Sequence, residues 1–375
     1  MSHIIIAMIE VGYGHKGPAL AIKNALEAAF PGQHRINVID FPAVSGAHRT
    51  DRTIKTAWDA ALQQPWIVRS SYALMEAVYP YSGKLLFPFM ADFFIRGAQY
   101  LAEQKPDLFI STHPMCSLVA AEARRRQGLT FPLVIDVVDP FDGYSLWAEG
   151  AADLFLVHSS QSRQILIDHG IDENRIRLVP YPRLPAMEPP TQPVEALRRT
   201  YGLDTEGKPV LLVTSGAQGL GRAYSFASRA YLEGFPADFL VVTGKNKKLY
   251  ENLTELVTKH TDKRLPGKLI PLSFVPCMAE LYSLCDMVVG KAGASTCMEA
   301  LSHKKPLICT EWAGQNDYKI IEFLVAHRLG SFTPRYREFI QVLASSPVYE
   351  KYDAEFSTYG ILQELRSFYA VSGSL

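Results

Sequence analysis

The sequence predicts an α/β protein built from two doubly wound domains, and three observations support that prediction. Short apolar runs alternate with amphipathic helical stretches, as in parallel sheets covered by helices on both faces. The two halves open alike, each with an apolar strand, a glycine-rich loop and a helix. A proline-rich segment, residues 180–193, lies between the halves. Because proline fits neither a helix nor a sheet interior, this segment is predicted to join two domains.

The first half opens with an expected strand over residues 4–9, the loop Gly12-Tyr-Gly-His-Lys-Gly17, and a helix over 19–30. Further strands are expected at 36–40, 108–112, 133–138, 154–158 and 176–179. The stretch from 51 to 96 is rich in aromatic residues but interrupted by prolines. It is typical of core, and it could equally form an apolar surface where a lipid acceptor enters.

The second half opens with an expected strand over 209–214, the loop Ser215-Gly-Ala-Gln-Gly-Leu-Gly221, and a helix over 223–233. Later strands are expected at 239–243, 269–274, 287–289 and 306–310. We therefore expect domains over 1–182 and 207–345, a linker over 183–206, and a helical tail over 346–375 that could pack back on the first domain. In such folds ligands bind outside the carboxyl ends of the strands.

Composition narrows the function classes. Lys+Arg and Asp+Glu both number 38, so no overall field attracts nucleic acid, and no nucleic-acid partner is expected. The five cysteines form no C-x-x-C pair, which argues against a metal site and favours a reducing compartment. The first residues have no basic region before their apolar run, and no stretch approaches the roughly 18 apolar residues needed to cross a membrane. We expect a cytoplasmic protein, either soluble or peripheral on the membrane face.

The first glycine loop has three competing interpretations. Gly12-x-Gly14-x-x-Gly17 matches the dinucleotide fingerprint, although Asp40 is poorly spaced to be its acidic partner. His15 and Lys16 are large polar groups on this loop, which favours a catalytic histidine. A simple tight turn into a helix would also give this pattern.

Two further loops could take part in chemistry. Asp139 follows a buried strand, so it could orient or deprotonate a ligand, or it could begin an Asx turn. The loop from Ser215 to Gly221 could bring its backbone close to a phosphate. A plain strand-to-helix turn remains the alternative there.

The segment Lys291-Ala-Gly-Ala-Ser-Thr-Cys-Met-Glu299 is the most informative in the chain. It follows an apolar strand and opens a helix, so it offers small residues, free backbone N–H groups and a positive helix end to an anion. Glu299 could hold a ribose diol or, with Thr296, close a capping box. The polar loop Gly314-Gln-Asn-Asp317 after the next strand could hold a sugar. Together these features indicate a nucleotide-sugar.

These motifs resemble those of the monogalactosyldiacylglycerol synthase and processive diacylglycerol glucosyltransferase group, which is related to MurG-type transferases. The resemblance runs from about residue 4 to residue 330 and includes the first loop, Asp139 with Trp147, and both C-terminal motifs. It implies a GT-B fold, with two Rossmann-like domains and a cleft between them. It also implies inverting transfer with no metal and no cofactor, the UDP-sugar being a co-substrate.

The resemblance also assigns residue roles. His15 and Asp139 are the catalytic candidates, and His15 is the favoured base because a free imidazole titrates near pH ~6.5. The expected acceptor contacts are Lys16, Tyr144 and Trp147. The expected donor contacts are Gly14, Ser215, Gly216, Phe274, Val275, Gly293, Ala294, Ser295, Thr296, Glu299, Gln315, Asn316 and Asp317. Within this set Phe274 and Val275 match the strip that recognises uracil, and Glu299 matches the ribose ligand.

The expected function is an inverting hexosyltransferase that moves glucose, galactose or N-acetylglucosamine from a UDP-sugar to a hydroxyl of a lipid such as diacylglycerol. Three alternatives remain open at this point. They are an enzyme like UDP-N-acetylglucosamine 2-epimerase, a non-catalytic nucleotide-sugar-binding module, and an NAD(P)-dependent oxidoreductase.

Overall fold

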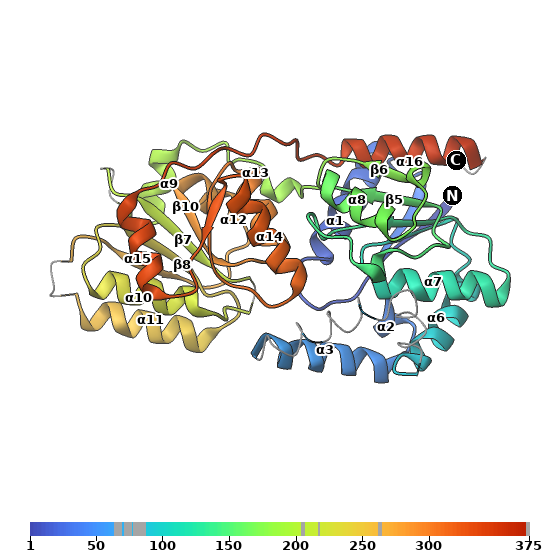
Figure 1. The fold of residues 1–375 in the computed structure, drawn as a ribbon, viewed down its shortest axis with the longest axis horizontal. Helices are drawn as coiled ribbons and strands as arrows, with labels where there is room; N and C mark the ends of the chain where they lie inside the picture. Colours follow the sequence, from blue (N-terminus) through green and yellow to red (C-terminus); the bar gives the residue numbers. More distant parts are fainter. Residues whose placement is uncertain are drawn as a thin grey trace. The chain divides into compact units, whose positions relative to one another are not determined.

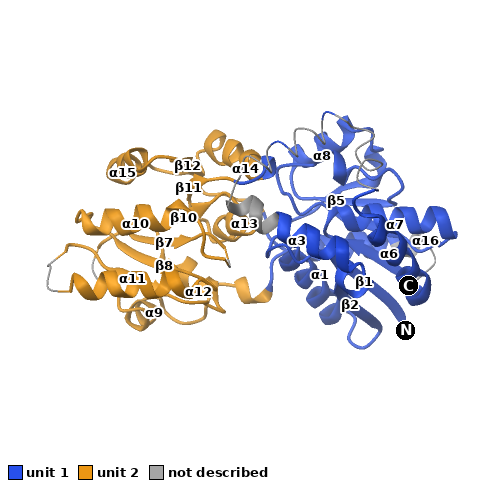
Figure 2. Ribbon diagram, turned by 90° about the horizontal axis from the view of Figure 1, so that it is seen from below, with its two compact units in different colours: residues 1–184, 313–316, 355–375 blue, residues 185–312, 317–354 orange. Residues whose placement is uncertain are grey.

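The computed structural model describes residues 1–63, 70, 77, 88–203, 207–216, 218–261 and 265–372. The chain forms two compact units, coloured separately in Figure 2. Unit 1 comprises residues 1–184, 313–316 and 355–375, and unit 2 comprises residues 185–312 and 317–354. Each unit contains a six-stranded sheet whose paired strands are parallel. The predicted α/β class with two doubly wound sheets is confirmed.

The sheet of unit 1 has the strand order β2-β1-β3-β4-β5-β6. Its central strands are short and almost fully buried because helices cover both faces (Figure 1). The strands are β1 (Ser2–Met8), β2 (His34–Asp40), β3 (Leu108–Ser111), β4 (Leu133–Asp136), β5 (Leu154–Val157) and β6 (Ile176–Leu178).

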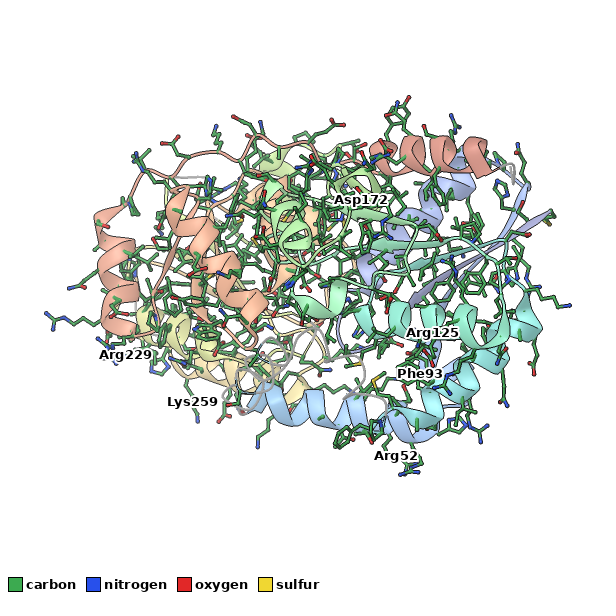
Figure 3. All side chains as sticks on the ribbon, turned by 45° about the vertical axis from the view of Figure 1, so that its right-hand side comes forward. Arg52, Phe93, Arg125, Asp172, Arg229 and Lys259 are labelled. Atoms are coloured by element: carbon green, nitrogen blue, oxygen red, sulfur yellow. The ribbon has the colours of Figure 1, made fainter. Side chains whose placement is uncertain are left out.

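Residues that alternate along β1 face two separate cores. Ile4 and Ile6 pack with α1 (Lys16–Ala29) and α16 (Tyr359–Ser372). Ile5 and Ala7 lie in the other core, with α6 (Ala91–Gln104) and α7 (Pro114–Gln127). Phe93 of α6, labelled in Figure 3, is fully buried there. The remaining elements of the unit are α2 (Phe41–Val44), α3 (His48–Gln63), α8 (Ser160–Asp168), η1 (Ser145–Trp147) and η2 (Glu173–Arg175).

The sheet of unit 2 has the order β12-β11-β10-β7-β8-β9. Its strands are β7 (Val210–Thr214), β8 (Asp238–Val242), β9 (Leu269–Leu272), β10 (Met287–Lys291), β11 (Leu307–Glu311) and β12 (Gly330–Phe332). Its helices are α9 (Val194–Thr200), α10 (Arg222–Leu232), α11 (Lys247–Lys259), α12 (Met278–Leu284), α13 (Ala294–Ser302), α14 (Gln315–Ala326) and α15 (Tyr336–Ser345), with the turn η3 (Pro185–Met187). Arg229 of α10 and Lys259 of α11 form surface ion pairs one helical turn apart, with Glu233 and Glu255 (Figure 3).

Each sheet has one point where the strand order reverses. In unit 1 the chain continues from β1 to β2 on one side of the sheet and from β3 to β4 on the other side. In unit 2 it continues from β7 to β8 on one side and from β10 to β11 on the other. At such a switch point the loops after the two strands diverge and leave room for a ligand at the carboxyl edge.

Three predicted segments can be set beside the observed elements. The expected linker over 183–206 contains η3 and α9, and its residues from 185 to 206 fall in unit 2. The expected tail over 346–375 includes α16, whose Ile361 and Leu365 lie in a core of unit 1, the unit against which the tail was expected to pack. The expected loop around Gln315 is the first turn of α14, so its polar residues lie at a helix N-terminus.

The aromatic stretch from 51 to 96 is described only in part. Its Trp66, Tyr72, Tyr79, Tyr81 and Phe87 lie outside the described residues, so the predicted acceptor surface there stays a prediction. Within the described part of the stretch, α6 contributes core side chains, and Phe89 just before it is 80% exposed. No helix in the described part of the chain has the length and apolarity needed to cross a membrane.

Candidate functional site

His15 lies at the carboxyl edge of unit 1, at the start of α1. Its Nδ1 is 2.6 Å from the backbone oxygen of Thr112, which follows β3 across the switch point. A carbonyl oxygen can only accept, so Nδ1 holds the imidazole proton. The other nitrogen, Nε2, therefore has a lone pair that can accept a proton. The structure thus gives His15 the tautomer that a general base needs.

The environment of His15 keeps its ring neutral. Burial lowers the pKa of His15 below its ordinary 6.5, and the charge of Asp139 and the bond to Thr112 partly offset this effect. A neutral imidazole at neutral pH is ready to take a proton, and the nearby carboxylate stabilises the imidazolium that would result.

A second histidine, His113, lies against the first, with 4.4 Å between the ring centroids. It is the N-cap of α7, and its Nδ1 accepts from the backbone N–H of Met115 at 3.2 Å. Burial, and then the neighbouring His15, lower the pKa of His113 well below its ordinary value. His113 is not among the residues predicted from the sequence. Its position could have been found, because Thr112-His113-Pro114 directly follows a predicted strand and proline favours the first position of a helix.

Asp139 is buried beside this histidine pair. Its Oδ2 accepts from the indole N–H of Trp147 at 2.8 Å, and its Oδ1 accepts from the side-chain amide of Asn316, a residue that also belongs to unit 1, at 2.9 Å. Asp139 is thus held by side chains rather than by the Asx turn that was left open.

The three expected acceptor residues have different surroundings. Trp147 is fully buried, with its ring centroid 6.3 Å from that of His15. Tyr144 is half-buried and meets Trp147 edge-on. Lys16 pairs with Glu10 at 2.6 Å. The acceptor contacts expected of these three residues stay predictions.

Two helix N-termini lie at the carboxyl edge of unit 2. The helices α10 and α13 follow β7 and β10, which are neighbours in the sheet. A helix start carries partial positive charge and N–H groups that have no partner inside the helix. Of the expected diphosphate contacts, Gly293 is the N-cap of α13, and Ala294, Ser295 and Thr296 form its first turn. These residues are suited to bind an anion.

Glu299 is one and a half turns into α13 and does not form a capping box. The N-cap is Gly293, with no side-chain cap, so Thr296 is already inside the helix. The Oε2 of Glu299 instead accepts from the hydroxyl of Tyr282 at 3.0 Å. Burial raises the pKa of Glu299 to about 7, and the bond from Tyr282 opposes this shift. Tyr282, which was not predicted, is itself fully buried and stacks on His303.

The other expected donor residues lie on three segments, two of them in unit 2 and the third at the start of α14, whose Gln315 and Asn316 belong to unit 1. Asp317, in the first turn of α14, forms an ion pair with Lys291, with 3.2 Å between Oδ2 and Nζ, and its side chain is 7% exposed. Gln315 precedes it and is half-buried. Phe274 is exposed and Val275 is half-buried on the loop after β9. Ser215 and Gly216 follow β7, and the Ser215 N–H donates to the Tyr224 hydroxyl at 3.0 Å.

Solved structures with the same architecture define the fold of this chain. MurG from Acinetobacter baumannii matches with a TM-score of 0.61 at 13% identity, over 92% of this chain and 91% of that one. Anabaena HepE, solved in complex with UDP and glucose, matches with a TM-score of 0.51 at 15% identity, over 92% of this chain and 89% of that one. The protein has the GT-B fold, as the sequence motifs implied.

Two family models match separate parts of the chain. The model of monogalactosyldiacylglycerol synthases matches residues 15–182, and the model of the glycosyltransferase family 28 C-terminal domain matches residues 210–318. These matches confirm the expected resemblance to the monogalactosyldiacylglycerol synthase and processive diacylglycerol glucosyltransferase group.

Curated relatives from the same group match the chain at low sequence identity. Monogalactosyldiacylglycerol synthase 1 of Arabidopsis thaliana is 24% identical over 355 residues, which cover 91% of this chain and 64% of that protein. The processive diacylglycerol beta-glucosyltransferase of Bacillus subtilis is 28% identical over 213 residues, covering 57% of this chain and 53% of that protein. The chain therefore spans less than two thirds of the length of these relatives.

Proposed function

We propose that this protein is an inverting hexosyltransferase that moves a hexose from a UDP-sugar to a hydroxyl of a lipid acceptor such as diacylglycerol. The observation that supports it most is the geometry at His15. A buried neutral imidazole has its proton fixed on Nδ1 by Thr112, and the charge of Asp139 acts on the ring. Such a group serves proton removal from a hydroxyl. The names of the relatives supply the substrate class.

The donor is proposed to bind at the carboxyl edge of unit 2. The amides of Gly293 to Thr296 at the start of α13 would hold the diphosphate, and Ser215 and Gly216 would approach it from the neighbouring loop. Glu299 would accept from the ribose hydroxyls, and Phe274 and Val275 would border the uracil. Gln315, Asn316 and Asp317 would contact the hexose. Anabaena HepE, which has the same fold, was solved with UDP-glucose, which supports a donor of this class.

The chemistry is a single displacement. The acceptor oxygen attacks the anomeric carbon, the bond from that carbon to the diphosphate oxygen breaks, and the acceptor proton passes to Nε2 of His15. Asp139 stabilises the imidazolium so formed. The charge that develops on the departing UDP is stabilised by the partial positive end of α13. Because one attack occurs from the face opposite the leaving group, the anomeric configuration inverts.

The acceptor is proposed to approach unit 1, where Lys16 follows His15 in the sequence and Trp147 lies between His15 and Tyr144. Since diacylglycerol resides in a bilayer, the working place of the enzyme would be a cytoplasmic membrane face.

The test uses radiolabelled UDP-glucose, UDP-galactose and UDP-N-acetylglucosamine, each with a total lipid extract. Label that moves into the organic phase with one donor supports the proposal. Binding of UDP without any transfer would indicate a binding module. Epimerisation of UDP-N-acetylglucosamine without an acceptor would indicate an epimerase. The His48→Ala variant is a matched control for a change at His15, because His48 is an exposed histidine of the same unit.

A further inference from the structure

A carboxylate of the protein itself, that of Glu311, lies at the end of the glycine loop of unit 2, residues 215–216 and 218–221. The backbone N–H of Arg222, the first residue of α10, donates to Oε1 of Glu311 at 2.9 Å. The Arg222 guanidinium Nε lies 3.8 Å from the other carboxylate oxygen. A helix start and a cation are two groups that bind phosphate in proteins.

The loop is closely fitted to this carboxylate. A Cβ at Gly221 would lie 1.8 Å from Oε1 of Glu311, and Gly221 has φ of 130°, which few other residues adopt. Glu311 ends β11, whereas α10 follows β7, with β10 between the two strands. Its side chain therefore reaches across the end of β10 to the start of α10. The Ala292 N–H also donates to the Glu311 backbone oxygen at 3.0 Å, which ties Glu311 to the approach to α13.

The charges around Glu311 are those that a diphosphate would also meet. Arg222 and Lys291 stabilise its ionised form, whereas Asp317 opposes it. Burial is the largest influence and raises the pKa of Glu311. Its side chain is 19% exposed, so a ligand can reach it from the edge of the sheet. A phosphate drawn to Arg222 and the N-terminus of α10 must displace this carboxylate or lie beside its charge.

We propose that Glu311 is a tethered competitor for the diphosphate, which lowers the affinity of the donor site for UDP and promotes product release. The inference rests on the proposed function, because it assumes that UDP binds at this edge. The terminal phosphate of a UDP-sugar is esterified to the sugar, whereas that of UDP carries no ester bond and so has one more ionisable oxygen. A fixed carboxylate repels the more highly charged product more strongly than the donor.

The experiment is isothermal titration calorimetry with UDP, UMP and uridine on the wild type, Glu311→Gln and Glu311→Ala. Glutamine keeps an acceptor for the Arg222 N–H but removes the charge. Alanine removes both the charge and the side-chain acceptor. We expect UDP to bind Glu311→Gln about three- to tenfold more tightly, and Glu311→Ala at least as tightly as that, as expected for a repulsive charge in a partly buried site. The affinity for UMP should rise less than that for UDP, and the affinity for uridine should not change.

The matched control is Asp286→Asn. Asp286 also accepts a backbone N–H, that of Val210 at 2.8 Å, but it lies at the amino ends of β7 and β10. Removing its charge should leave the affinities for all three ligands unchanged. Thermal melting of each variant checks that it is folded, and either Glu311 variant alone is sufficient for the test.

UDP that binds a folded Glu311 variant no more tightly than it binds the wild type would overturn the inference. An equal gain for uridine would also overturn it, because the gain would then not depend on charge. Wild-type protein that binds neither UDP nor uridine would instead refute the proposed donor site itself.

Discussion

The carboxyl edges of the two sheets have the same topology and different chemistry. In unit 1 the switch point brings together two neutral imidazoles and a carboxylate that is fixed by an indole. In unit 2 the switch point brings together two helix N-termini, those of α10 and α13, with carboxylates and a lysine nearby. The first arrangement suits the movement of a proton, and the second suits the binding of an anion.

The comparison shows how one fold can divide two tasks. A general base must stay uncharged until it reacts, so burial around His15 favours catalysis. An anion site must offer unpaired donors, so the helix starts of unit 2 face the edge instead of the core. If this division is correct, variants of unit 1 should change turnover, and variants of unit 2 should change donor affinity.

The largest expected effect is on turnover in His15→Ala. Without the base, the rate of hexose transfer should fall about 10²- to 10⁴-fold, the usual contribution of general acid–base catalysis. The dissociation constant for UDP should not change, because the variant leaves unit 2 intact. Steady-state kinetics and calorimetry on the same preparation measure the two quantities, with His48→Ala as the control. A parallel loss of rate and of UDP affinity would contradict the division of tasks.

The next effect is on donor affinity in Glu299→Gln. Loss of the carboxylate should weaken UDP and uridine alike by about tenfold, as expected for a lost charge-assisted hydrogen bond to the ribose. The maximal rate at saturating donor should change little. Tyr282→Phe is the companion variant, since it frees the same carboxylate from its hydroxyl partner. If Glu299→Gln lowers the melting temperature and leaves both affinities as they were, Glu299 is a structural residue only.

A smaller effect is expected on the pH profile of Asp139→Asn. Asp139 raises the pKa of His15, so removing its charge should lower that pKa further. A base is active above its pKa, and the acid limb of the kcat/KM profile should therefore move to lower pH. The rate itself should fall about tenfold because the imidazolium loses its stabilising partner. An acid limb that stays in place would show that the two groups are not coupled.

The smallest expected effect is on stability, and it has opposite signs in the two units. Burial raises the pKa of Glu299 to about 7, so the folded state holds the proton more tightly than the unfolded state. This group therefore lowers stability as pH rises from about 4.5 to about 7. The pKa of His15 is lowered, so its contribution to stability is lost as pH falls from 6.5 through the folded-state value.

Thermal melting of the wild type, Glu299→Gln and His15→Gln between pH 4.5 and pH 8 checks these signs. The melting temperature of Glu299→Gln, relative to that of the wild type, should increase as pH rises. The melting temperature of His15→Gln, relative to that of the wild type, should increase as pH falls. The same trend in both variants would contradict the assigned causes.

Much of the fold could be predicted from the sequence because continuous apolar strands alternate with amphipathic helices. The strands predicted at 108–112 and 287–289 lie where β3 and β10 are found. The start of α14 was missed, because Gly314 and the polar residues that follow are typical of a loop. Helix starts and loops share the same small and polar residues, so composition alone does not separate them.

The candidate site could be predicted only as a set of residue types. His15, Asp139 and Glu299 were identified because each follows a predicted strand. The partners of His15 and Glu299 were not, because Tyr282 lies 17 residues before Glu299 and Thr112 lies 97 residues after His15. The role of Glu311 was hidden for the same reason, since strand order and not sequence distance brings it to Arg222.

The most direct test of the account follows UDP release from the preferred UDP-hexose with and without diacylglycerol, in the wild type and in His15→Ala. The account predicts rapid release only when the wild type has both substrates, with one glycolipid formed for each UDP. Release that is equally fast without the acceptor, or glycolipid formation that is undiminished in His15→Ala, would contradict it.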